Sequence, residues 1–64
     1  MKTKEIVEKW KNGEEMPYMT NKHLYKIARK VNADTSVADT LQSADVISEA
    51  LIETINKRME ELKN

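Results

Sequence analysis

The chain has 64 residues with no Cys and a single His, so it has room for one domain but no disulfides and too few ligands for a protein-only zinc or iron site. Hydrophobic residues make up 39% and charged residues 34%, with one Gly and one Pro, which indicates an ordered helical domain rather than a disordered chain or a sheet protein. The formal net charge is zero, no apolar run approaches the roughly 18 residues of a membrane span, and the first residues lack the apolar stretch of a secretion signal. We therefore expect a cytoplasmic protein.

The first helix is predicted over residues 4–11. Thr3 can cap its N-terminus, and Ile6, Val7 and Trp10 fall on one face. The helix should stop at residues 12–13, because Gly13 tolerates the left-handed backbone of a C-terminal cap. A helix with so few apolar residues must pack against another part of the chain.

The connector over residues 14–19 has too many apolar residues for a linker that makes no contacts. Pro17 disfavours a helical residue before it, and at least two of Met16, Tyr18 and Met19 are expected to pack under the helices.

The second helix is predicted over residues 21–31, with Thr20 as its N-cap and Met19 and Leu24 spaced as a hydrophobic staple. Asn32 can end it. Its apolar face follows the i, i+3, i+4, i+7 pattern and consists of Leu24, Ile27, Ala28 and Val31.

A long periodic segment predicts a third helix over residues 37–63, which begins at a cap formed by Ser36 and Asp39. Val46 lies opposite its apolar side, so the alternative is a break near Ser43, where Ser43 and Asp45 can both act as caps. We favour one continuous helix. The sequence therefore predicts a single all-α domain over residues 1–64, with a short first helix, a medium second helix and a long C-terminal helix.

The residues that catalysis would need are missing. His23 has no Ser or Asp partner at a recognisable spacing, and the one Gly, Gly13, cannot form a phosphate-binding loop. His23 is expected to be a half-exposed surface residue. We predict that the protein is not an enzyme and has no metal, cofactor or small-molecule substrate.

Charge is divided between the two halves of the chain and points to a surface for partners. Residues 1–31 carry eight Lys and Arg against four Glu, whereas residues 32–64 carry three against seven Asp and Glu. Four cations lie opposite the apolar side of the second helix, and we call them the basic face: Lys22, Lys26, Arg29 and Lys30. This face is either a solvated helix surface or an electrostatic footprint for an acidic protein or nucleic acid. Trp10 is either a core anchor or a recognition anchor.

Residues 27–33, with Ala38 and Leu41, loosely resemble a helix-turn-helix with Asn32 at the turn. The resemblance implies DNA binding. The recognition helix it implies would begin near Ser36, offer no Lys or Arg to bases or phosphates, and place Asp39 toward the phosphates.

The C-terminal part of the third helix offers a self-association surface. Its apolar residues exceed what two short helices could cover, and a chain this small often gains stability from a second subunit. This C-terminal stripe consists of Leu51, Ile52, Ile55, Met59 and Leu62.

Together these features predict a small non-catalytic adaptor, inhibitor or regulator that forms a homodimer and binds another protein, by analogy with accessory proteins of bacteria and their phages. The alternatives are a nucleic-acid-binding regulator that uses the basic face and a purely structural homo-oligomer.

Overall fold

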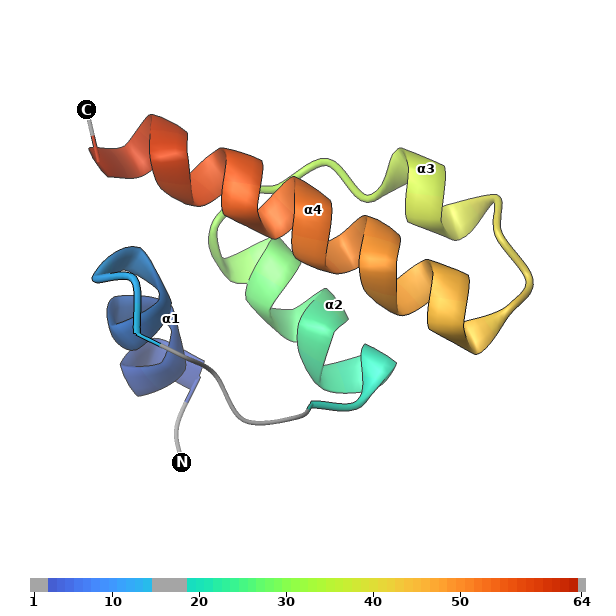
Figure 1. The fold of residues 1–64 in the computed structure, drawn as a ribbon, viewed down its shortest axis with the longest axis horizontal. Coiled ribbons are helices and arrows are strands. Elements are labelled where there is room, and N and C mark those ends of the chain that lie inside the picture. Colours follow the sequence, from blue (N-terminus) through green and yellow to red (C-terminus); the bar gives the residue numbers. More distant parts are fainter. Residues whose placement is uncertain (1–2, 15–18, 64) are drawn as a thin grey trace.

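The computed structural model describes residues 3–14 and 19–63, and these residues form helices and connectors only. The helices are α1 (Thr3–Lys11), α2 (Asn21–Lys30), α3 (Ser36–Asp39) and α4 (Ala44–Lys63). In the view of Figure 1, α4 runs along the long axis of the molecule, with α1 and α2 below it and α3 above it. The all-α prediction with a long C-terminal helix is confirmed. Met16, Pro17 and Tyr18 of the predicted connector lie outside the described residues.

The helix α1 ends as the sequence predicts. Gly13 has a φ of +81°, its N–H donates to the carbonyl of Trp10, and the N–H of Glu14 donates to the carbonyl of Lys9. These two bonds form a Schellman motif, which satisfies carbonyl groups that a helix end otherwise leaves unpaired.

Both ends of α2 are also held by local hydrogen bonds. The Thr20 hydroxyl accepts from the N–H of His23 at 3.3 Å, which confirms Thr20 as the N-cap. Asn32 has a φ of +58°, and the N–H of Ala33 donates to the carbonyl of Ala28 at 2.8 Å. A second bond, from the N–H of Asn32 to the carbonyl of Arg29, completes another Schellman motif and confirms Asn32 as the residue that ends the helix.

The prediction of one continuous helix over residues 37–63 is wrong. The single turn of α3 ends where the Thr40 hydroxyl donates to the carbonyl of Val37 at 2.7 Å, and α4 begins at Ala44. An unbroken helix of 27 residues would be about 40 Å long, whereas the longest dimension of the molecule is 30 Å. The break lets α3 fold back on α4 and bury Ala38. The alternative break near Ser43 is the one that forms.

The start of α3 also differs from the prediction by one residue. Thr35 occupies the cap position, while the N–H of Ser36 donates to the carboxylate of Asp34 at 2.9 Å. This bond holds the pKa of Asp34 below its ordinary value, because it stabilises the charged carboxylate. The Asp34 carboxylate therefore binds the first N–H of α3, whereas the side chain of Thr35 makes no capping bond and Ser36 is already part of the helix.

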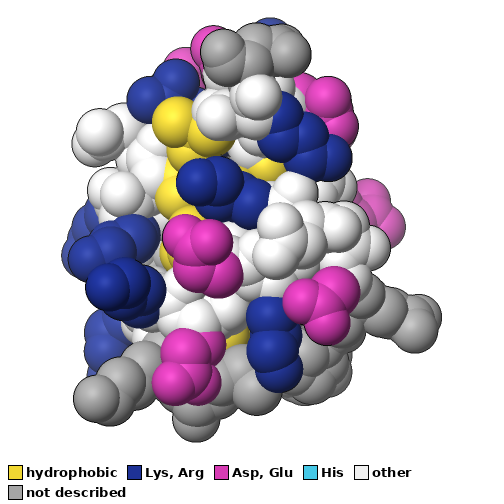
Figure 2. All heavy atoms as spheres, turned by 90° about the vertical axis from the view of Figure 1, so that its left-hand side faces the viewer, with side chains coloured by type: hydrophobic (Ala, Val, Ile, Leu, Met, Phe, Trp, Pro, Cys, Tyr) yellow, Lys and Arg dark blue, Asp and Glu magenta, His cyan; other side chains and the backbone are white. Residues whose placement is uncertain are grey.

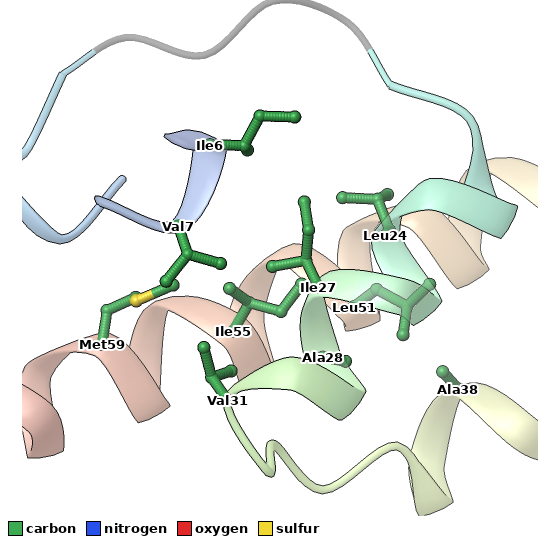
Figure 3. Packing of buried hydrophobic residues seen from close by; sticks show 10 residues of the cluster. All are labelled: Ile6, Val7, Leu24, Ile27, Ala28, Val31, Ala38, Leu51, Ile55 and Met59. Carbon is green, nitrogen blue, oxygen red and sulfur yellow. The ribbon is translucent and has the colours of Figure 1, made fainter. Parts of the chain in front are cut away.

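The core lies on one side of α4, where α1, α2 and α3 meet it (Figure 3). In the close view, Met59 lies beside Val7, and Ile55 lies among side chains of α2. The fully or nearly fully buried apolar residues are Ile6, Val7, Leu24, Ile27, Ala28, Val31, Ala38, Leu51, Ile55 and Met59. Burial of these side chains is the main favourable term for folding.

Polar side chains of α4 fasten it to the connector between α2 and α3. The Nε of Arg58 donates to the carbonyl of Val31 at 2.6 Å, and the Thr54 hydroxyl donates to the carbonyl of Asp34 at 2.7 Å. Both carbonyls follow the last turn of α2, where no helical partner is available to them. Packing and hydrogen bonding thus hold α2 against α4 over its whole length.

The start of α2 is fastened to the start of α4 in the same way. The side-chain amide of Asn21 donates to the carbonyl of Ala44 at 3.1 Å and accepts a hydrogen bond from the Ser48 hydroxyl.

Two isoleucines of α4 provide a matched test of this core. Ile55 is fully buried and Ile52 is 41% exposed on the same helix. We expect Ile55→Val to lower the free energy of unfolding by about 1 kcal/mol, because it removes a methyl group from a packed site. Ile52→Val should change it by less than about 0.5 kcal/mol. Urea unfolding followed by circular dichroism measures both, and equal losses for the two variants would contradict this core.

Candidate binding surface

The basic face forms on the side of α2 that points away from the core. Lys22, Lys26, Arg29 and Lys30 are all exposed, whereas Leu24, Ile27 and Ala28 are buried on the opposite side. Among the described residues, none of these four cations takes part in an ion pair. Their charge is therefore available to a partner.

The lysines of the basic face have a regular spacing. Lys22, Lys26 and Lys30 follow one another at i, i+4 and i+8, so they form a row along α2 with steps of about 6 Å. Because the helix is capped at both ends and packed along one side, the row is held in place by the fold.

The structure places Trp10 against the core. Its ring is half-buried, and its Nε1 donates to the side-chain oxygen of Asn56 on α4 at 2.5 Å. This arrangement matches the core-anchor interpretation. A role for Trp10 in recognition stays a prediction. Trp10 also lines a shallow hollow between α1 and α4, so part of its side chain is exposed there.

Most of the predicted C-terminal stripe is not available for self-association. Leu51, Ile55 and Met59 are buried within the chain, where they receive α1 and α2. The core of a single chain uses these three residues, so the prediction that they are left over for self-association is wrong for them. Only Ile52, 41% exposed, and Leu62, 40% exposed, remain on the surface.

The geometry of a DNA-reading helix-turn-helix is not formed. Asn32 does make the turn, but α3 is a single turn from Ser36 to Asp39 and contains no Lys or Arg. Asp39 accepts a hydrogen bond from the Tyr25 hydroxyl of α2 at 2.9 Å, so its carboxylate is turned toward α2. A helix this short and without cations cannot supply the contacts of a recognition helix.

A groove lies between one side of α1, the end of α2 and the end of α4, and the sequence alone did not reveal it. Its volume is about 400 Å³. Its lining combines cations with apolar side chains. We call it the end groove, and its lining includes Lys4, Val7, Glu8, Lys11, Lys30, Val31, Arg58 and Leu62. Figure 2 shows the side of the molecule where α1 and the end of α4 lie, with a narrow apolar strip among Lys and Arg side chains and with Asp or Glu side chains also close to it.

The position of Arg58 in this groove could not be predicted from the sequence. Arg58 interrupts the apolar pattern of α4, and its Nε donates to the carbonyl of Val31, which lies 27 positions earlier in the chain. Lys4 and Lys11 belong to α1 and Lys30 belongs to α2. Only the tertiary fold brings the three lysines to the same groove.

A second groove lies between α3 and α4 and has a volume of about 490 Å³. Its charged side chains are of mixed sign, with Asp34 and Glu53 close to Lys57 and Arg58, and Val37 lies at its edge. It therefore has no single preference for the charge of a partner.

The described residues form no group of metal ligands at these surfaces. Within residues 3–14 and 19–63, no cluster of three or more His, Asp or Glu side chains could hold a metal ion. His23 is half-buried, and its Nε2 has no hydrogen-bond partner. None of the described helices is long and apolar enough to cross a membrane.

Comparison with known proteins adds no relative. Neither the protein-family models, nor the curated proteins, nor the solved structures contain a match to this chain. The chemistry of the surface is therefore the basis for a functional proposal.

The bond between Tyr25 of α2 and Asp39 of α3 predicts a pH dependence of folding. The hydrogen bond to the Asp39 carboxylate raises the pKa of Tyr25 above its ordinary value of 10.0, aided by partial desolvation, because it favours the neutral phenol. Folding then gains stability below pH 10, and this gain is lost as the pH rises through the pKa of the folded state. We expect the ultraviolet titration of wild type minus Tyr25→Phe to show this raised pKa, and Asp39→Ala to return it toward 10. An unchanged Tyr25 pKa in Asp39→Ala would contradict the contact.

Proposed function

We propose that this protein is a non-catalytic binding protein whose basic face binds an acidic surface of another protein. The observation that carries the proposal is the exposure of Lys22, Lys26, Arg29 and Lys30 on one side of α2, with no ion pairs to the described residues. An adaptor, inhibitor or regulator could each work through such a contact.

The fixed position of the face supports a specific partner. A binding surface on a capped and packed helix loses little backbone freedom when a partner binds, so more of the contact energy appears as affinity. The row formed by Lys22, Lys26 and Lys30 matches a helix that presents carboxylates at i, i+4 and i+8. We therefore propose an acidic helix as the partner element.

The charge balance favours a protein over nucleic acid. The formal net charge is zero and the isoelectric point is about 6.6, whereas nucleic-acid-binding domains are usually strongly basic as a whole. The short, cation-free α3 removes the motif that suggested DNA. A nucleic-acid-binding regulator that uses the basic face stays the runner-up.

Self-association is a further candidate function, and one observation supports it. Asp45, Glu49 and Glu53 are exposed on α4 at the same i, i+4, i+8 spacing as the lysine row. A second copy could meet the basic face with this acidic row, head to tail, as a structural homo-oligomer. A homodimer through the C-terminal stripe now depends on Ile52 and Leu62 alone.

A charge-reversal experiment tests the proposal. We expect a synthetic helical peptide with Glu at i, i+4 and i+8 to bind at low salt and to shift the amide NMR signals of residues 22–30. Lys22→Glu/Lys26→Glu should weaken binding at least about tenfold, because it replaces two attractions by repulsions. The matched control, Lys9→Glu/Lys57→Glu, makes the same change of net charge at exposed positions outside the basic face and should lower the affinity much less.

The outcomes separate the candidates. Equal losses in the two double variants, or no binding of the peptide by wild type, would contradict the proposal. Tighter binding to a short DNA duplex than to the peptide, with a steep fall as salt rises, would support the nucleic-acid alternative instead. A mass that increases with protein concentration at low salt, without any added peptide, would support the homo-oligomer.

A further inference from the structure

We infer that the end groove receives an apolar side chain of the same acidic partner, with a partner carboxylate beside it on Arg58. This inference rests on the proposed function and adds the anchor that an electrostatic contact alone lacks. Anchors of this kind, an apolar side chain inserted into a pocket and ringed by polar contacts, carry most of the affinity in many protein interfaces.

The floor of the groove is apolar and formed by residues from three helices. Val7 and Val31 belong to the buried core, Leu62 is 40% exposed, and all three line the groove. An apolar side chain placed there would extend the core outward and remove the exposed part of Leu62 from water.

The rim is basic. Lys4, Lys11, Lys30 and Arg58 line the groove, and Glu8 is its one carboxylate among the described residues. On the side of α1 and the end of α4, Figure 2 shows Lys and Arg side chains beside an apolar strip, with Asp or Glu side chains also near it. Four cations against one carboxylate give the groove an excess of positive charge, so it favours an anchor flanked by carboxylates.

Arg58 is held in a position suited to a carboxylate. Its Nε is bonded to the Val31 carbonyl at 2.6 Å, which fixes the plane of the guanidinium, and its Nη1 lies 3.8 Å from Glu61. The separation of 3.8 Å from Glu61 is longer than a hydrogen bond, so a partner carboxylate at hydrogen-bond distance can compete with Glu61 for the guanidinium. Because the guanidinium is already oriented, a carboxylate can bind it at a small cost in side-chain entropy.

Continuity with the basic face joins the two surfaces. Lys30 is the last residue of the lysine row and also lines the end groove. A helix that lies along the row with its carboxylates on Lys22 and Lys26 therefore reaches the groove at its end. A partner with an apolar residue one turn beyond its last carboxylate would engage both.

The test uses two peptides and two matched variants of α4. One helical peptide carries Glu at i, i+4 and i+8 followed one turn later by Leu, and the other replaces this Leu by Ala. Leu62→Glu places a charge in the groove, and Ile52→Glu makes the same change at an equally exposed position of α4 outside it. Circular dichroism first checks that both variants keep the helical content of wild type.

We expect the Leu peptide to bind wild type about tenfold more tightly than the Ala peptide. Leu62→Glu should remove this difference, Ile52→Glu should keep it, and the Leu62 amide signal should shift only with the Leu peptide. Equal binding of the two peptides to wild type would overturn the inference, as would equal effects of Leu62→Glu and Ile52→Glu.

The failures of the two proposals are distinguishable. If both peptides bind equally and Lys22→Glu/Lys26→Glu weakens both, the basic face functions without the groove. If neither peptide binds wild type at low salt, the proposed function fails and the groove inference fails with it. If dodecanoate, a fatty acid with the same apolar and carboxylate chemistry, shifts the groove signals while the Leu peptide does not, the groove takes a free lipid acid and the inference is overturned.

Discussion

The contact between α2 and α4 is the interaction on which the rest of the molecule depends. These two helices share the most extensive interface, with Leu24 and Ile27 on one side and Leu51 and Ile55 on the other, all almost fully buried. The helices α1 and α3 are too short to be stable in water and gain their order by packing on this pair. Because a core this small has little stability to spare, each buried side chain of α4 is committed to folding.

The burial of these side chains of α4 decides which surfaces remain exposed. Most of the apolar side of α4 is turned inward, and the exposed charged side chains are basic on α2 and acidic over the first half of α4. The basic residues project from α2, and the row of Asp45, Glu49 and Glu53 projects from α4 on the side away from its core. Where one side of α1 meets the ends of α2 and α4, the packing is incomplete, and the end groove is left between Val7, Val31 and the last turn of α4. A partner is therefore offered charge along one helix and an apolar contact at its end.

Local signals in the sequence were enough for most helix boundaries. Gly13 and Asn32 end α1 and α2 because a left-handed residue satisfies the last carbonyls of a helix, and this chemistry needs no distant contact. The division near Ser43 was harder, since apolar periodicity continues through it and only the fold shows that α3 must turn back to cover α4. The basic face could be predicted because it lies on one helix. The end groove and the bond from Arg58 to Val31 could not be predicted, because they join residues that are far apart in the sequence, by 27 positions for the bond. The same reason explains the error in the C-terminal stripe, whose burial depends on how α1 and α2 cross it.

Because the apolar side of α4 is buried within one chain, we expect the molecule to fold alone. Light scattering at several protein and salt concentrations tests this expectation. The expected result is the mass of a single chain, 7.4 kDa, at moderate salt and at every concentration. A dimer that persists on dilution and is unaffected by salt would contradict it, because such a dimer needs a large apolar interface, whereas Leu51, Ile55 and Met59 are already buried within one chain.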